Sequence, residues 1–274
     1  MITIKEALTK KEMKDYVMFS FELYKDNPYW IPPIIAEELE TFDKTKNPTL
    51  QTAEAHFYLA YKDDKIVGKI AAIINWEEVT ILEKRKVRFG WFDVIDDIEV
   101  TKALLNKVEE LGIKHQMDHM EGPMGFSNLD KVGVLSEGFD QMGNMITWYS
   151  MPYYIEHFEQ LGLTVEKAYQ ESIFSFNDID PTQFNKFSGL IQERYQLRSL
   201  NFTKTKDIMP YVDQMFDLFN TTYSKLQSFV PINAIQKAYF KKKYISFINP
   251  EFIKFVMDKN NNMIAFAIVM PGFA

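Results

Sequence analysis

The sequence predicts a mixed α/β protein, and two observations support this fold class. Two apolar runs, residues 56–61 and 66–74, flank a short polar turn, which is typical of a β-hairpin. Apolar residues also recur at helical spacing on both sides of this hairpin, in residues 13–24 and 98–111. Strands alternating with amphipathic helices predict a sheet covered by helices.

The first expected elements are a strand and a helix. Residues 2–7 alternate between apolar and polar side chains, which predicts a strand. Thr9 and Glu12 have the spacing of a capping box, so we expect a helix to begin there. This helix must end before Asn27 and Pro28, because the residue preceding a proline disfavours the α region.

A strand, a helix and a second strand should follow the hairpin. Residues 88–95 form an apolar run, and the helical pattern after Asp96 and Asp97 ends at Gly112, which we expect to close the helix. A short strand is expected at residues 120–124, parallel to the strand at 88–95. A helix ending at Gly162 and a strand over residues 168–176 should complete the unit.

The pattern then restarts. The hairpin FIKFVMDKNNNMIAFAIVM (residues 252–270) shares with FYLAYKDDKIVGKIAAII (residues 57–74) an opening Phe, an Asp-containing turn and an apolar return strand. We therefore expect one complete domain over residues 1–176, a linker over 177–194, and the N-terminal half of a second, similar domain over 195–274. The second domain is expected to be truncated, so the chain alone is expected to be inactive, and the strand at 263–270 needs a pairing partner.

Composition restricts the classes of function. The 274 residues carry a formal net charge of −7, which opposes binding to nucleic acid, and contain no Cys, which excludes disulfides and a cysteine nucleophile. No signal peptide or membrane-spanning run is present in the sequence, so we expect a cytoplasmic protein. Residues 241–243 are three lysines flanked by aromatic residues, which leaves peripheral membrane contact open. The oligomeric state is also open.

The histidines do not predict a metal site. His115, Asp118 and His119 spell H-x-x-D-H, which could bind a metal only on one continuous helix. Because a helix should end just before them and a strand should follow, we expect no metal.

Several blocks together resemble a known family. They are NPYWIPP (27–33), RFGWFDVIDD (88–97), EGPMGFSNLD (121–130), EGF (137–139) and YY…GL (153–163). In this order, and with this succession of elements, they resemble a bacterial tandem-GNAT family that includes the bacterial ceramide synthases. The resemblance implies acyl transfer from an acyl-coenzyme A to an amine, which in some relatives is a sphingoid base. It also implies that acyl-CoA is a co-substrate whose binding turn lies mainly beyond Ala274.

Two positions depart from the usual GNAT pattern. GNAT domains usually hold the coenzyme A pyrophosphate on a glycine-rich turn at a helix N-terminus, but here that position reads DVIDDIEVTKAL. Asp96 and Glu99 have capping-box spacing, and their carboxylates would repel a pyrophosphate. Many GNAT enzymes also place a Tyr proton donor four residues before a Gly, where this chain has Phe158.

The candidate site residues fall into two groups. Acyl transfer needs a base to deprotonate the amine and an acid to protonate the leaving thiolate, so the catalytic candidates are Glu121, Asp96, Tyr153 and Tyr154. An acyl chain needs apolar walls, so Trp30, Phe92 and Phe139 are substrate-binding candidates, and Asn128 joins them as an expected border residue of the acceptor pocket. Each residue has a structural alternative, namely helix capping for Asp96, an exposed strand end for Glu121, and core packing for the aromatic residues.

The leading hypothesis is an acyl-CoA-dependent N-acyltransferase whose acceptor is a small amine or amino lipid. The alternative is a catalytically silent GNAT-like module that binds an acyl ligand or a protein partner. Thiol release from acyl-CoA would discriminate between them.

Overall fold

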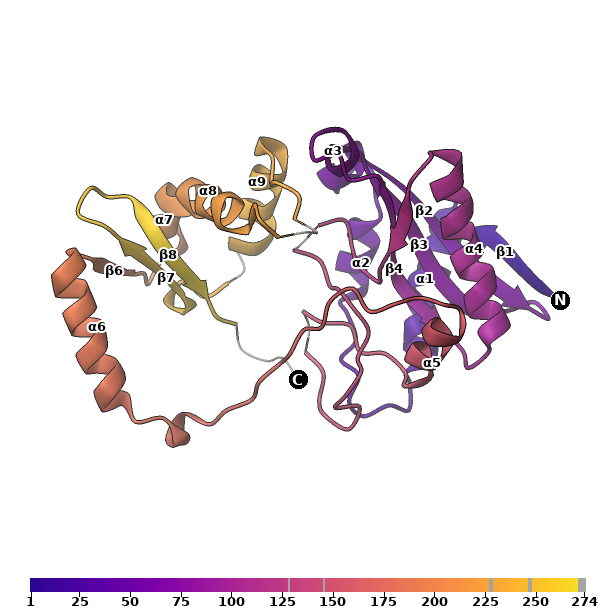
Figure 1. Ribbon diagram of the computed structural model, residues 1–274, viewed down its shortest axis with the longest axis horizontal. Helices are drawn as coiled ribbons and strands as arrows, with labels where there is room; N and C mark the ends of the chain where they lie inside the picture. The colour runs from indigo at the N-terminus through magenta and orange to yellow at the C-terminus, as the bar shows by residue number, and fades with distance from the viewer. Residues whose placement is uncertain (128, 145, 227–228, 246–247, 271–274) are drawn as a thin grey trace. The chain divides into compact units, whose positions relative to one another are not determined.

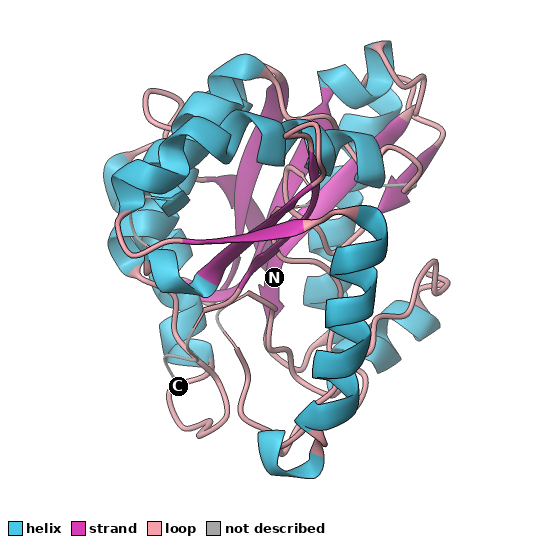
Figure 2. Cartoon of the chain, turned by 90° about the vertical axis from the view of Figure 1, so that its left-hand side faces the viewer, coloured by secondary structure: helices cyan, strands magenta, loops and turns pink. Residues whose placement is uncertain are grey.

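The computed structural model describes residues 1–270 except 128, 145, 227–228 and 246–247. This part of the chain forms two compact units, of which the first comprises residues 1–164 with 229–230 and the second residues 165–226 with 231–270. Helices and strands mix in both units (Figures 1 and 2). The predicted mixed α/β class is confirmed.

The first unit is built on one five-stranded sheet. Its elements in chain order are β1 Ile2–Glu6, α1 Lys10–Leu23, α2 Ile35–Thr41, the 3₁₀ helix η1 Pro48–Gln51, β2 Ala53–Lys62, β3 Lys65–Asn75, α3 Trp76–Thr80, β4 Lys86–Val94, α4 Ile98–Lys114, β5 His119–Glu121 and α5 Tyr153–Gln160. The sheet order is β1-β2-β3-β4-β5. Neighbouring strands are antiparallel except β4 and β5, which run parallel as predicted.

The two faces of this sheet carry separate cores. Along β3, Ile70, Ala72 and Ile74 pack with α4 and α5, whereas Ala71 and Ile73 pack with α1 and α2. This division follows from the alternation of side chains along a strand. Figure 1 shows α4 crossing the strands that it covers.

Local signals explain where the helices begin and end. The capping box is confirmed, since Thr9 Oγ1 accepts from Glu12 N at 3.2 Å and Glu12 Oε2 accepts from Thr9 N at 2.8 Å. Gly162 has φ +82° just after α5, as expected for a helix terminator. The prediction that Gly112 closes α4 is wrong, because the helix continues to Lys114. A Cβ on Gly112 would lie 2.9 Å from Val87 Cγ1, so this glycine allows the helix to approach β4 closely.

The second unit contains a three-stranded sheet with the order β6-β7-β8. Its elements are η2 Phe176–Asp178, α6 Pro181–Tyr195, β6 Arg198–Asn201, α7 Thr205–Ile208, η3 Met209–Tyr211, α8 Val212–Tyr223, α9 Ala234–Phe240, the π-helical turn η4 Lys241–Ile245, η5 Pro250–Phe252, β7 Ile253–Met257 and β8 Met263–Ile268. The predicted second hairpin is present as β7 and β8. None of the described helices is long and apolar enough to cross a membrane.

One expectation just before residue 176 is wrong at the level of secondary structure. Residues 168–176 were expected to form a strand, but residues 165–175 contain no regular element and are exposed. A strand forms only where a partner supplies hydrogen bonds, and no described strand pairs with this segment. Most of the expected linker is the helix α6, which Asp180 caps by accepting from Thr182 N at 2.9 Å.

Candidate active site

A β-bulge interrupts β4 at the centre of the first unit. Lys69 pairs with Asp93 and Ala71 with Gly90, so Trp91 and Phe92 together lie opposite Ile70 alone. Trp91 has φ +44°, an unusual conformation for a bulky residue. Bulges of this kind re-aim side chains next to functional sites, and here the bulge directly precedes Asp93.

The Asp93 carboxylate is the centre of a largely buried polar cluster. Its Oδ2 accepts from Ser20 Oγ at 2.6 Å and lies 3.3 Å from Lys69 Nζ. Its Oδ1 accepts from Tyr24 at 2.9 Å and from Tyr154 at 3.3 Å. Both carboxylate oxygens therefore have partners, which fixes the position of the Asp93 side chain.

Burial controls the ionisation of the tyrosines around this cluster. Burial, and then the Asp93 charge, raise the pKa values of Tyr16, Tyr24 and Tyr154 well above the ordinary value for tyrosine. All three are therefore neutral hydroxyls at physiological pH. Lys69 Nζ lies 5.0 Å from the ring centre of Tyr16, within the range of a cation–π contact.

A cavity of about 40 Å³ opens beside the bulge. Three of the chain's four tryptophans line it, namely Trp30, Trp91 and Trp148. Its polar wall consists of Ser20, Tyr24, Glu38, Lys69, Asp93, Lys131, Asn144, Thr147 and Tyr149. This volume accommodates a small polar group, so a larger ligand would have to extend out of the mouth.

Glu38 and Lys131 lie on this wall with incomplete partners. Glu38 Oε2 accepts from Trp91 Nε1 at 3.1 Å, and Oε1 has no hydrogen-bond donor among the described residues. Burial lowers the pKa of Lys131, while the charges of Glu38 and Asp93 oppose this shift. Within the described chain no carboxylate lies within 4.0 Å of Lys131 Nζ.

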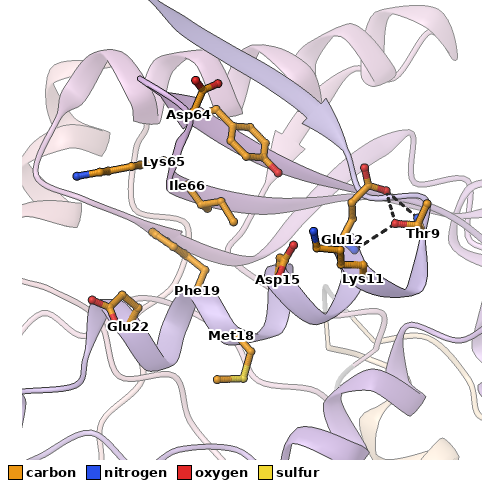
Figure 3. Close-up of a pocket in the computed structure, with 11 residues that line it drawn as sticks. Thr9, Lys11, Glu12, Asp15, Met18, Phe19, Glu22, Asp64, Lys65 and Ile66 are labelled. Atoms are coloured by element: carbon orange, nitrogen blue, oxygen red, sulfur yellow. Dashed lines mark hydrogen bonds between the residues drawn. The ribbon is translucent and has the colours of Figure 1, made fainter.

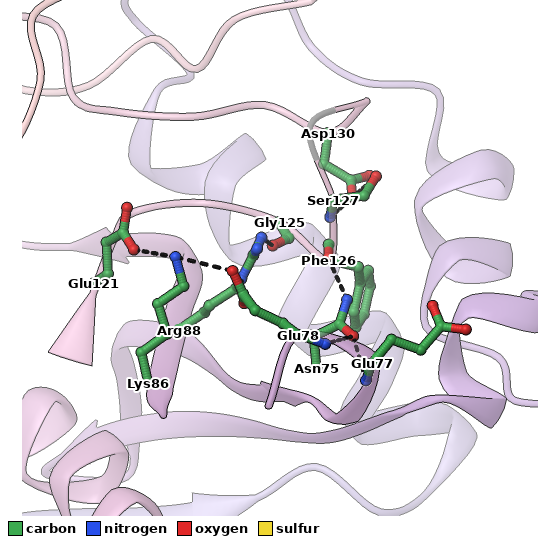
Figure 4. A network of polar contacts seen from close by, with 10 residues as sticks. All are labelled: Asn75, Glu77, Glu78, Lys86, Arg88, Glu121, Gly125, Phe126, Ser127 and Asp130. Carbon is green, nitrogen blue, oxygen red and sulfur yellow. Dashed lines mark hydrogen bonds and ion pairs between the residues drawn. The ribbon is translucent and has the colours of Figure 1, made fainter. Parts of the chain in front are cut away.

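A second cluster of charges joins α3, β4 and β5 (Figure 4). Arg88 Nε donates to Glu78 Oε2 at 2.9 Å, and Lys86 Nζ lies 3.0 Å from Glu78 Oε1 and also pairs with Glu121. Arg88 Nη1 donates to the Gly125 carbonyl at 3.1 Å. The charges of the two cations and the two carboxylates compensate each other. Through the hydrogen bond from Arg88 to Gly125, the cluster also connects β4 and β5 to the loop at residue 125. The predicted catalytic candidate Glu121 lies in this cluster, outside the cavity wall.

The N-terminus of α4 is occupied by carboxylates. The N-cap is Asp97, whose Oδ1 accepts from Glu99 N at 3.1 Å, so the expected capping box of Asp96 and Glu99 is wrong by one residue. A hydrogen bond from Lys62 lowers the pKa of Asp97. Anionic side chains in the first turn do not fit a pyrophosphate, in agreement with the departure seen in the sequence.

Asp96 itself forms a different contact. Its Oδ1 lies 3.2 Å from His157 Nε2, and His157 Nδ1 lies 2.9 Å from Thr101 Oγ1. The order Thr, His, Asp resembles a nucleophile triad, but Thr101 is fully buried and cannot reach a substrate. The three residues therefore join α4 to α5.

The remaining candidates are divided between the cavity and the core. Trp30 and Phe92 line the cavity. Tyr153 OH donates to the Val94 carbonyl at 2.7 Å, and its pKa is raised by burial. Phe139 lies outside the cavity wall, and its carbonyl accepts from Tyr149 OH at 2.6 Å. Asn128 lies outside the described residues.

Phe158 occupies the position where a GNAT proton donor was expected. It is buried in the core with Phe89 and Phe92, at ring distances of 5.8 and 5.2 Å. One turn earlier, the hydroxyl of Tyr154 accepts from Val94 N of β4 at 3.0 Å.

A wider surface groove of about 840 Å³ lies between α1 and the β2–β3 turn (Figure 3). Its charged side chains belong to Lys11, Glu12, Asp15, Glu22, Asp64 and Lys65. Glu12 is committed to the Thr9 cap, and the other side chains spread along an open surface. Because no set of groups converges there, we place the candidate site at the smaller cavity.

Sequence reasoning missed Ser20, Tyr24, Glu38, Lys69 and Lys131. Lys69 gave one detectable signal, since a lysine inside an apolar strand is rarely buried without a partner. Glu38 and Lys131 gave none, because only the fold brings α2 and the loop after β5 to one cavity.

No family model matches this chain. It is 25% identical over 272 residues to protein YghO from Escherichia coli strain K12, a match covering 98% of this chain and 68% of that protein. It is also 29% identical over 133 residues to the bacterial ceramide synthase of Caulobacter vibrioides, which covers 48% of this chain but only 35% of the synthase. The chain thus spans about a third of that relative.

A solved structure supports the fold. The tandem GNAT protein from the clavulanic acid biosynthesis pathway matches 99% of this chain and 76% of its own chain, with a TM-score of 0.50 and 10% identity. The predicted resemblance is thereby confirmed: this chain has the fold of the GNAT acyltransferases and is similar in sequence to a bacterial ceramide synthase.

Proposed function

We propose that this protein takes part in acyl transfer from an acyl-coenzyme A to an amine, and that the cavity beside the β4 bulge receives the amine. The observation that carries the proposal is a small charged cavity, walled by tryptophans, at the bulge of a GNAT fold. The similarity to a ceramide synthase supports an acyl reaction and makes an amino lipid one candidate acceptor.

In this reaction the nitrogen lone pair of the acceptor attacks the thioester carbonyl. A C–N bond forms, the C–S bond breaks, and the proton lost by the nitrogen balances the proton gained by the leaving coenzyme A thiolate, which departs as the thiol. The residues of the cavity would orient the amine and exclude bulk water, which increases the effective concentration of the two reactants. We assign no pyrophosphate contact to the N-terminus of α4, because Asp97 and Glu99 disfavour an anion there.

Thiol release tests the proposal. The whole encoded protein and this chain would each be incubated with short- and long-chain acyl-CoAs and with polyamine, amino-acid and sphingoid amines. We expect acceptor-dependent thiol release by the whole protein, reduced at least ten-fold by Trp91→Ala because a cavity wall is lost. Lys102→Met on the exposed side of α4 is the matched control.

The second candidate function is a silent GNAT-like module that binds an acyl ligand or a protein partner. Two observations favour it, namely the carboxylates at the N-terminus of α4 and the apolar Phe158. Acyl-CoA binding without thiol release from any acceptor would support this candidate. If the whole protein neither binds acyl-CoA nor releases thiol, the enzyme proposal fails.

A further inference from the structure

Among the charged groups of the cavity, Glu38 and Lys131 form no ion pair with each other. Glu38 lies on α2, and Lys131 lies in the loop after β5. Both line the cavity, and the two charged groups are more than 4.0 Å apart. They therefore face the same space as a separated pair of opposite charges.

The other charges of the cavity are already satisfied. Lys69 donates to Ser20 Oγ at 2.6 Å and pairs with Asp93 at 3.3 Å. Asp93 has contacts on both oxygens. A ligand would have to break these contacts to bind Lys69 or Asp93, whereas Glu38 Oε1 and Lys131 Nζ are available without such a loss.

Hydrogen bonds fix the Glu38 side chain and the Lys131 backbone in place. Glu38 is oriented by the indole N–H of Trp91, at 3.1 Å. Lys131 is held by its backbone, since its carbonyl accepts from Gly125 N at 3.2 Å and Gly133 N donates to Pro123 O at 2.7 Å. The two charges are thus presented by structured segments, which reduces the entropy lost when a ligand binds.

We propose that Glu38 and Lys131 select a zwitterionic ligand, an amine that carries a carboxylate or a phosphate a few bonds away. Glu38 Oε1 accepts from the ammonium group, and Lys131 Nζ donates to the anionic group. This inference rests on the proposed function, because it takes the amine of the ligand to be the acyl acceptor. It restricts the acceptor to amines that also carry an anionic group. Lys131 is partly buried and has no carboxylate within 4.0 Å among the described residues, so an anionic ligand group would supply a direct partner.

The test measures binding rather than turnover. Because three of four tryptophans line the cavity, quenching of intrinsic fluorescence reports its occupancy. The probes are β-alanine and O-phosphoethanolamine as zwitterions, ethanolamine as the amine alone, and acetate and inorganic phosphate as the anions alone. We expect one zwitterion to bind at least ten-fold more tightly than ethanolamine or either anion.

The variants separate the two contacts. Lys131→Met and Glu38→Gln are each expected to weaken binding of the preferred zwitterion about ten-fold or more. In Lys131→Met, zwitterion and ethanolamine should bind equally. Lys102→Met, an exposed lysine on α4, should leave the affinity unchanged, and thermal melts followed by circular dichroism verify that each variant folds.

Each outcome decides the proposal. Preference for β-alanine identifies a carboxylate and preference for O-phosphoethanolamine a phosphate, and either supports it. Equal binding of zwitterion and ethanolamine by the unaltered protein, no binding of any probe, or full affinity in Lys131→Met would overturn it. The binding assay contains no acyl-CoA. Its result therefore does not depend on whether the protein catalyses acyl transfer, and the two proposals can fail separately.

Discussion

At the scale of single residues, the environment of each carboxylate decides its role. The block RFGWFDVIDD contains Asp93, Asp96 and Asp97, which the sequence alone does not rank. In the fold, Asp93 lies in the polar cluster, Asp96 contacts His157, and Asp97 caps α4. Sequence spacing could predict a cap near this position, but the bulge that directs Asp93 to the cavity depends on pairing with β3.

Asp93→Asn should be strongly destabilising. The substitution removes the partner of Lys69, whose side chain is only 5% exposed, and leaves a buried cation without compensation. We expect the free energy of unfolding to fall by about 3–5 kcal/mol, measured by urea denaturation. Asp64→Asn, on an exposed turn where Asn tolerates the positive φ, is the matched control and should change stability by less than about 0.5 kcal/mol. Equal effects of the two substitutions would contradict the role given to Asp93.

The buried tyrosines predict a loss of stability at alkaline pH. Tyr24 and Tyr154 ionise near pH 10 in the unfolded chain, but their pKa values in the fold are raised. Above pH 10 the unfolded chain therefore binds fewer protons than the folded one, so stability is retained below pH 10 and falls as the pH rises further. Urea denaturation at pH 8, 10 and 11 checks this. Tyr24→Phe combined with Tyr154→Phe should flatten the decline, and an unchanged decline would contradict the assignment.

At the scale of elements, local signals predicted the helices and strands that depend on short-range chemistry. The Thr9 capping box, the β2–β3 hairpin and the terminator Gly162 are all confirmed because their energetics are local. Residues 168–176 share the strand pattern, but a strand also needs a partner, which sequence spacing does not reveal. The role of Gly112 could not be predicted from the sequence either, because it depends on the close approach of α4 to Val87.

Substitutions can show whether Asp97 or Asp96 is the N-cap of α4. Asp97→Ala removes the acceptor for Glu99 N and the partner of Lys62, so we expect a loss of about 1–2 kcal/mol in unfolding free energy. Asp96→Ala, next to it and 72% exposed, should cost less than half as much because its contact with His157 is near solvent. Urea denaturation of both variants measures the difference. If Asp96→Ala were the costlier change, the cap would be assigned wrongly.

At the scale of the whole molecule, the chain divides into two compact units joined by an exposed stretch. Residues 165–175 lack regular structure and are exposed, among them Lys167, Tyr169 and Phe174. The similarity between the two hairpins continues to support our proposal of two related domains, with the domain bounds expected from the sequence. The two compact units divide after residue 164, and the composition change at 178–182 follows the exposed segment rather than starting it.

Limited proteolysis should cut first in this stretch. Trypsin at low concentration is expected to cleave after Lys167, because exposed backbone without hydrogen-bonded partners enters a protease site readily. Mass spectrometry should then detect a resistant fragment of residues 1–167 that retains the five-stranded sheet. Early cleavage inside β2–β4 would contradict the division into these units.

The bulge at Trp91 changes which face of the sheet the odd-numbered and even-numbered side chains of β4 occupy. Val87 and Phe89, at odd positions, face the core under α4, but beyond the bulge this face is taken by Phe92 and Val94, at even positions. Trp91 accordingly faces the other core, and Asp93 shares its face. If β4 continued from Phe89 in strict alternation without the bulge, Asp93 would point into the apolar core under α4 and Phe92 would take its place at the cavity. One extra residue in the strand thus decides which face of the sheet carries the charge.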